Sequence, residues 1–124
     1  MTEWEDRMDA TRSRVAEPRG GLTVDTRHDA DAVFVALAGE LDLATAERAR
    51  DALADAMDAS RQRLIVDLSS LGFIDSSGLH ALLDAYKRCR GAHPVLTIRP
   101  GPPNVQQVFE LTNTLDYLPF ESSR

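Results

Sequence analysis

The chain has 124 residues, with a hydrophobic fraction of 43% and a charged fraction of 27%, which is the composition of one globular domain. Its formal net charge of −6 and its pI of about 4.9 exclude a surface built to bind the phosphate backbone of a nucleic acid. No apolar run is long enough for a membrane span, and the first residues lack the apolar segment of a secretory signal. The single cysteine, Cys89, cannot form an internal disulfide, which fits the reducing cytosol, so we expect a cytoplasmic protein. Because no apolar run is long enough to span a membrane, we expect no membrane partner.

The first 20 residues differ in composition from the rest of the chain. They are mostly charged and lead into Pro-Arg-Gly-Gly at positions 18–21, as is typical of a flexible arm. Trp4 is an apolar residue that can anchor a partner, but an ordinary residue of such an arm is the more frequent case. We therefore expect a flexible arm over residues 1–20 and a single domain over residues 21–122.

Two strands are predicted at the start of the domain. Residues 22–27 alternate apolar and polar side chains, as a half-buried edge strand does. Residues 28–31 form a polar turn, and residues 32–38 are a continuous apolar run of strand length. The two segments predict a β-hairpin, and we expect Gly-Glu-Leu-Asp at 39–42 to end its second strand.

A helix is predicted over residues 45–60. Thr45 is a suitable N-cap, and Glu47 stands in the first turn, where the helix dipole favours a negative charge. Small and apolar residues recur at helical spacing and predict the buried face of this helix: Ala46, Ala49, Leu53, Ala56 and Met57.

The second half of the chain continues to alternate strands with helices. Residues 63–68 predict a buried strand, and residues 69–75 a connection. A helix then begins at Ser76 or Ser77 and ends near Arg90. Its apolar stripe consists of Leu79, Leu82, Leu83 and Tyr86.

The last predicted elements are shorter. Residues 95–99 predict a strand and residues 104–111 a helix. Asn113 is suited to the left-handed position that ends a helix, and residues 117–120 form a terminal apolar anchor. Since strands alternate with helices after the first hairpin, we expect an α/β fold. It is a small mixed β-sheet with amphipathic helices packed mainly on one face.

The segment Asp75-Ser76-Ser77-Gly78 lies at the predicted start of a helix. The amide N–H groups of a first helical turn have no partners within the helix, and the helix dipole adds positive potential there. A phosphoryl group on a serine would therefore be stabilised electrostatically. Gly78 lacks a Cβ, so a kinase or a neighbouring loop can approach its backbone closely. Taken alone, however, Asp and Ser are also the most ordinary of N-caps.

A longer stretch gives this segment a more specific interpretation. Residues 64–79, which read Leu-Ile-Val-Asp-Leu-Ser-Ser-Leu-Gly-Phe-Ile-Asp-Ser-Ser-Gly-Leu, resemble the signature of STAS domains. They are similar in particular to the bacterial anti-sigma factor antagonists. The segments 39–42 and 108–112 resemble the same family, so the resemblance covers residues 22–120. It implies a STAS-like fold over nearly the whole domain.

The resemblance also implies a mechanism. Such an antagonist binds an anti-sigma factor that is also a serine kinase, and a sigma factor is released. The kinase then phosphorylates the antagonist, which dissociates, and a phosphoserine phosphatase resets it. The serine after the Asp is the one modified, which is Ser76 in this chain. The implied partner-binding residues are Glu40, Asp42, Asp75, Ser76, Ser77, Gly78, Leu79 and His80.

The chain departs from the family pattern at two places. His80 stands where the family often has a small residue, which alters the fit of a partner, and Asn113-Thr114 replaces a turn that often contains glycine. His80 is also four residues from Asp84, so an ordinary pair on a helix surface is the simpler interpretation of this histidine.

Other candidate groups have ordinary interpretations too. Glu40 and Asp42 either frame the surface around Ser76 or are solvated acids of a loop. Cys89 is predicted to be a core or boundary residue rather than a reactive thiol. The three histidines show no spacing that binds a metal, and the glycine-rich loop that holds a nucleotide phosphate is missing, so we expect no metal and no cofactor.

Two other functions compete with the antagonist. A serine hydrolase needs a nucleophile elbow, but Ile74 stands where that motif has its first glycine, so we do not expect an enzyme. A non-switching STAS interaction or scaffold module of a stress-signalling complex is compatible with the same residues, and it remains the alternative.

Overall fold

Seven regular elements follow one another in the order predicted from the sequence. The computed structural model describes residues 21–60 and 62–121. The elements are β1 (Leu22–His28), β2 (Ala32–Leu41), α2 (Ala46–Ala59), β3 (Arg63–Ile74), α3 (Ser76–Cys89), β4 (Val95–Arg99) and α4 (Pro103–Leu111). The expected α/β class is confirmed. The arm expected over residues 1–20 lies outside the described residues, as does the last residue of the domain expected over 21–122.

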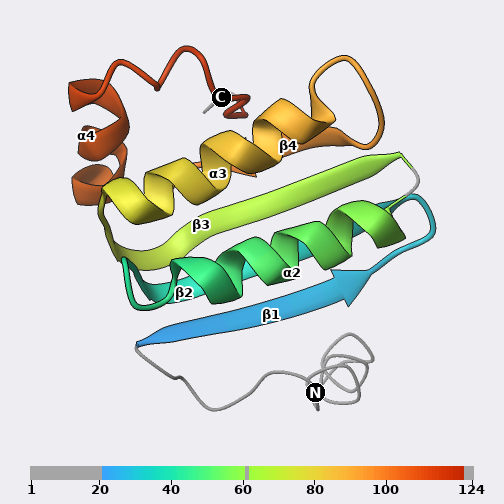
Figure 1. Ribbon diagram of the computed structural model, residues 1–124, viewed down its shortest axis with the longest axis horizontal. Helices are drawn as coiled ribbons and strands as arrows, with labels where there is room; N and C mark the ends of the chain where they lie inside the picture. The colour runs from blue at the N-terminus through green and yellow to red at the C-terminus, as the bar shows by residue number, and fades with distance from the viewer. Residues whose placement is uncertain (1–20, 61, 122–124) are drawn as a thin grey trace.

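The strands form one mixed sheet in the order β1-β2-β3-β4 (Figure 1). β1 pairs antiparallel to β2 in a hairpin, from Leu22 opposite Gly39 to His28 opposite Val33. β3 is parallel to both β2 and β4, and the helices α2 and α3 make the two crossovers. The carboxyl ends of β2 and β3 therefore lie side by side, and a helix begins just beyond each.

The core lies between the sheet and the helices α2 and α3, which run side by side across one face (Figure 1). Alternate strand residues point into it, as the pleat of a strand requires: Val33, Val35, Leu37, Leu64, Val66, Leu68, Leu96 and Ile98. All five residues of the predicted inner face of α2 are buried. Full burial of one such Leu or Val stabilises the fold by about 1.5–3 kcal/mol. Cys89 is buried as well, and this burial raises the pKa of its thiol.

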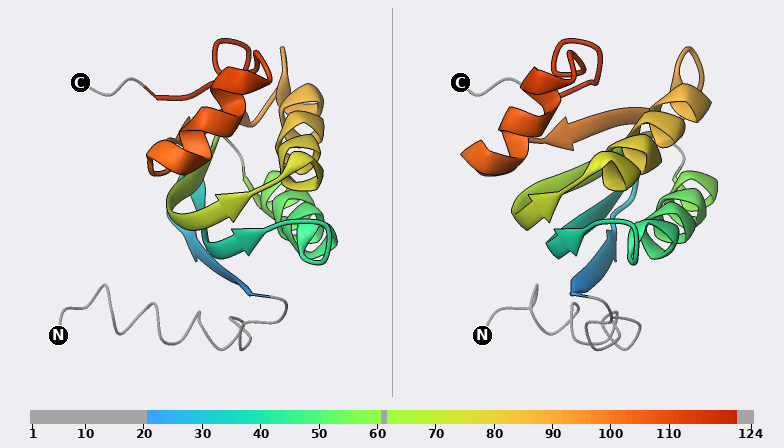
Figure 2. Two further views of the ribbon diagram at one scale, coloured as in Figure 1. Left: turned by 90° about the vertical axis from the view of Figure 1, so that its left-hand side faces the viewer. Right: turned by 60° about the vertical axis from the view of Figure 1, so that its left-hand side comes forward.

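The chain closes the β4 edge of the sheet with its last described residues. Helix α4 packs against β3, the neighbour of this edge strand, and lies apart from α2 and α3 (Figure 2). Ile98 donates its amide to Pro119 O at 2.9 Å, and Glu121 donates to Ile98 O at 2.8 Å. The rings of Phe109 and Phe120 meet edge to face, with centroids 4.9 Å apart. The predicted terminal anchor thus covers an edge that would otherwise be open to strand pairing.

Two predicted boundaries were wrong. The residues 39–42 do not end the second strand, since β2 continues to Leu41, and the residues 69–75 are not a connection, since β3 continues to Ile74. The two extensions pair with each other, with irregular register on either side of Gly39. Gly39 has a φ of +100°, and a Cβ there would lie 1.9 Å from Gly21 O. Glycine therefore bends the strand here without ending it.

An ion pair between Arg50 and Asp84 joins the outer surfaces of α2 and α3. The hydrogen bond from Arg50 lowers the pKa of Asp84, and the charges of Arg50, Lys87 and His80 act in the same direction. A lowered pKa in the folded protein means that the pair adds stability above the ordinary carboxyl pKa. This stability is lost as the pH falls through the lowered value.

Arg50→Ala is therefore expected to raise the pKa of Asp84 toward its ordinary value, as measured by NMR titration of its carboxyl group. Because the two side chains are 35% and 54% exposed, the free energy of unfolding near neutral pH should fall by less than about 1 kcal/mol. Arg88→Ala is the control, because Arg88 pairs with Asp58 instead. An Asp84 pKa that is the same in the Arg50 variant and the wild type would contradict the expectation.

Within residues 21–60 and 62–121, no helix combines the length and the apolar character needed to cross a membrane. The longest helices, α2 and α3, have 14 residues each, whereas a helical span takes about 20.

Candidate functional site

The predicted site residues lie at one end of the sheet, where β2 leads into α2 and β3 leads into α3. The left-hand view of Figure 2 looks onto this end, and the start of α4 lies beside it. Leu41 and Ile74 are paired at the ends of the two strands, and Asp75 donates its amide to Leu41 O at 3.2 Å. Two segments far apart in the sequence therefore form one surface.

Ser76 is the first residue of α3, as predicted, and its side chain is exposed. Asp75 is the N-cap in extended conformation. Its Oδ1 accepts hydrogen bonds from the amides of Ser77 at 2.9 Å and of Gly78 at 3.2 Å. The serine hydroxyl therefore stands at the start of a well-anchored helix, and a kinase can reach it without unfolding the chain.

The capping by Asp75 changes one expectation. The amides of the first turn were expected to be open to a phosphoryl group, but two of them already bind the Asp75 carboxylate. A phosphate on Ser76 would gain less from these amides than predicted. It would also stand beside the negative charge of Asp75, with which it competes for the same donors.

Gly78 and Leu79 are buried, so they pack beneath the exposed residues at the start of α3 and are not themselves open to a partner. A Cβ on Gly78 would lie 2.6 Å from Leu41 Cγ and 2.7 Å from Leu41 O. The sequence left open whether a kinase or a neighbouring loop approaches the backbone of Gly78. In the structure, the neighbouring segment at the end of β2 does so. Gly78 lets the first turn of α3 rest directly on the end of β2.

The two acidic residues at the end of β2 have different surroundings. Glu40 is exposed. Asp42 is half-buried, and its Oδ1 accepts from the amides of Ala44 at 3.0 Å and Thr45 at 3.2 Å. Thr45 lies at the predicted N-cap position of α2, but its hydroxyl donates to Glu40 O at 2.9 Å and makes no cap bond to the helix. Asp42 therefore shapes the turn, which leaves Glu40 as the freer of the two acids.

Ser77 and His80 complete this end of α3. Ser77 is half-buried and His80 is exposed. Asp84 forms its ion pair with Arg50 and not with His80, which contributes only a smaller electrostatic effect. Within the described residues, no hydrogen bond joins His80 to Ser76, so the pair lacks the contact that activates a nucleophilic serine. We call the exposed and half-buried members of the predicted site the Ser76 surface: Glu40, Asp42, Asp75, Ser76, Ser77 and His80.

Two exposed apolar residues beside the Ser76 surface were missed by the sequence analysis. Leu43 is 80% exposed in the turn after β2, and Phe73 is 47% exposed near the end of β3. No signal in the sequence set Leu43 apart, since it stands between Asp42 and Ala44, two residues after Leu41. Phe73 lies in the predicted connection, where nothing in the sequence indicated on which face its side chain would lie.

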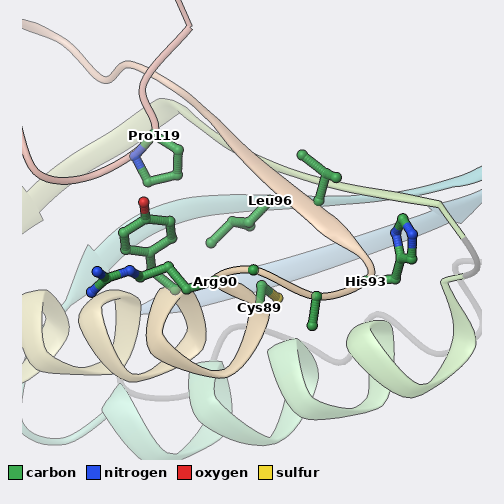
Figure 3. Close-up of a pocket in the computed structure, with 9 residues that line it drawn as sticks. Cys89, Arg90, His93, Leu96 and Pro119 are labelled. Atoms are coloured by element: carbon green, nitrogen blue, oxygen red, sulfur yellow. The ribbon is translucent and has the colours of Figure 1, made fainter.

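A cavity of about 480 Å³ lies at the opposite end of α3 (Figure 3). Cys89 and Leu96 lie between α3 and β4, while Arg90 and His93 stand at opposite ends of the cavity. Arg90 donates to the hydroxyl of Tyr117 at 2.9 Å. The polar groups do not converge on one point, as a binding site for a small molecule requires. Nowhere in the described part of the chain do three His, Cys, Asp or Glu residues gather in a way that could hold a metal ion.

Comparison with known proteins assigns the chain to a family. The model of the STAS domain family matches residues 23–124, which is most of the chain. The chain belongs to the STAS domain family. The membership expected from residues 64–79 and from the shorter segments 39–42 and 108–112 is thereby confirmed.

Several STAS relatives carry names that describe a function. The chain is 33% identical over 95 residues to BtrV of Bordetella bronchiseptica, a candidate anti-sigma factor antagonist, over 76% of this chain and 82% of BtrV. It is 28% identical over 90 residues to an anti-sigma-B factor antagonist of Listeria monocytogenes, over 73% of this chain and 79% of that protein. The crystal structure of an anti-sigma factor antagonist from Mycobacterium paratuberculosis has the same fold. Its TM-score is 0.75 at 22% identity, over 87% of this chain and 92% of that one.

Proposed function

We propose that this STAS domain is an anti-sigma factor antagonist. It binds an anti-sigma factor that has serine kinase activity (the partner kinase) and so allows a sigma factor to be released. The observation that carries the proposal is an exposed serine at the capped start of α3, in a chain one-third identical to BtrV. The protein acts in this proposal by binding and not by catalysis, in the cytoplasm where a sigma factor works.

The switch in this proposal is phosphorylation of Ser76. The partner kinase transfers the terminal phosphoryl group of ATP to the Ser76 hydroxyl, and the modified antagonist dissociates. A phosphoserine phosphatase removes the phosphate by hydrolysis and restores binding. The position of Ser76 supports both steps, because an exposed side chain in the first turn of a helix is open to two different enzymes.

Ser76→Ala is expected to abolish phosphorylation and to leave binding to the partner kinase within about threefold of wild type. The hydroxyl is exposed and makes no bond that holds the cap, since Asp75 caps α3 with its own side chain. The test is incubation with each candidate anti-sigma factor kinase of the encoding bacterium and ATP. Mass spectrometry of the peptide that spans residues 75–79 then locates the phosphate.

Ser77→Ala is the matched control, because Ser77 is the neighbouring serine of the same turn and is half-buried. It should be phosphorylated as the wild type is. Phosphate on the Ser76→Ala peptide would show that Ser77 is the modified residue. Tight binding by wild type without any phosphate on this peptide would instead favour the non-switching STAS module.

A further inference from the structure

The described part of the chain exposes five large apolar side chains, and two of them belong to the end of the sheet that carries Ser76. Leu43 is 80% exposed and Phe73 is 47% exposed. The other three, Val95, Leu111 and Tyr117, belong to other parts of the fold. Single exposed apolar residues are common on protein surfaces, but a pair beside a proposed modification site is a candidate contact surface.

The strand pairing places both residues at the end of the sheet where α3 begins with Ser76. Phe73 is paired with Glu40 on β2 and precedes Ser76 by three residues. Leu43 follows Leu41 by two residues, so their Cα atoms are at most about 7 Å apart. Leu41 in turn accepts the Asp75 amide at 3.2 Å and faces Gly78. The two junctions lie at the same end of the sheet in Figures 1 and 2.

The buried core of the described residues includes neither Leu43 nor Phe73. The turn that carries Leu43 is held by hydrogen bonds from the amides of Ala44 and Thr45 to the Asp42 side chain. A polar residue would satisfy the turn equally well and would avoid exposing apolar surface to water.

We propose that Leu43 and Phe73 form the apolar contact through which the partner kinase binds, an inference that rests on the proposed function. The two residues supply most of the affinity, whereas Ser76 at the same end of the sheet carries the phosphorylation state. Glu40 is paired with Phe73 and Asp75 follows Phe73 by two residues, so the partner presents an apolar pocket with basic groups at its rim. This division explains how one hydroxyl can control binding without being its main source.

Leu43→Ser is expected to weaken binding to the partner kinase about 20-fold, as measured by isothermal titration calorimetry with the kinase that phosphorylates the wild type. Phe73→Ser should weaken it by a similar factor, and the double variant by more than about 100-fold. Phosphorylation of Ser76 at saturating kinase should be retained in both single variants, because the serine and its cap are untouched. Circular dichroism should show an unchanged fold.

Leu111→Ser is the matched control, because Leu111 is 74% exposed at the far end of α4. It should bind the partner kinase as the wild type does. Wild-type affinity in the Leu43 and Phe73 variants would overturn the inference and leave the proposed function standing. Failure of the wild type to bind any candidate kinase would instead contradict the proposed function. If sedimentation showed that the same variants dissociate a dimer of this chain, the occupant would be a second copy, and the inference would be wrong.

Discussion

Phosphorylation of Ser76 is expected to weaken binding to the partner kinase more than a hundredfold and to leave the fold unchanged. Phosphate adds a charge of about −1.5 to −2 at neutral pH. In the free protein this charge extends from an exposed side chain into water, so the core does not sense it. In the complex, it would enter a contact from which water is partly excluded.

The capping geometry determines how the phosphate acts there. Asp75 already binds the amides of Ser77 and Gly78, so the phosphate meets a carboxylate where free donors were expected. Glu40 adds a further exposed acid at the end of the neighbouring strand. A loss of only about 3 kcal/mol in binding free energy exceeds a hundredfold change in affinity. Repulsion in a partly dry contact is sufficient for this, and no large conformational change is needed.

The measurement compares kinase affinity and folded-state spectra for the unmodified and the phosphorylated protein. Asp75→Asn in the phosphorylated protein is the informative variant, because the amide oxygen can still cap α3 while the charge is removed. It should recover part of the lost affinity. Equal affinity of modified and unmodified wild type would eliminate the switch. If the spectrum of the phosphorylated protein changed throughout, phosphorylation could still act as the switch, but the local mechanism without a large conformational change would be refuted.

Gly78→Ala is expected to destabilise the fold by about 2–3 kcal/mol, which lowers the melting temperature by roughly 10 °C in a domain of this size. The sign of this change in stability is informative, because a Gly→Ala substitution within a helix ordinarily stabilises the fold by about 1 kcal/mol. Here the new Cβ would lie 2.7 Å from Leu41 O and 3.0 Å from Ile74 Cγ1. A backbone oxygen at the end of a paired strand cannot move away cheaply, so the first turn of α3 must move instead.

Thermal and urea unfolding of the variant measure this effect, and kinase affinity should fall together with stability. Gly72→Ala is the control, because the nearest atom to its Cβ would be Gly39 O at an ordinary contact distance of 3.6 Å. Its free energy of unfolding should stay within about 1 kcal/mol of wild type. A Gly78 variant that is as stable as wild type would show that α3 does not rest on β2 as described.

The local features of this protein were predictable from short stretches of sequence. The alternation of apolar runs with amphipathic segments gave the order of all seven elements, because burial of one face imposes a period of about two residues on strands and about 3.6 on helices. The position of Ser76 at the start of α3 was equally local. An Asp before two serines and a glycine caps a helix through hydrogen bonds that span two or three residues.

The ends of β2 and β3 were not predictable in this way. Glycine and acidic residues at 39–42 and the serines at 69–70 ordinarily interrupt strands. In the structure, the two extensions pair with each other, from Gly39 opposite Leu71 to Leu41 opposite Ile74. Pairing between distant segments thus outweighed the local preferences of both.

The sequence by itself determined the fold class, the family resemblance and the serine at the start of a helix, since each depends on neighbours along the chain. Only the tertiary structure decided which candidate residues face outward. It buried Gly78 against Leu41, engaged Asp42 in its own turn, and left Leu43 and Phe73 in solvent beside Ser76. The physical reason is that a side chain's exposure depends on what packs against it, and here the packing elements are two strand ends that meet only after the sheet has formed.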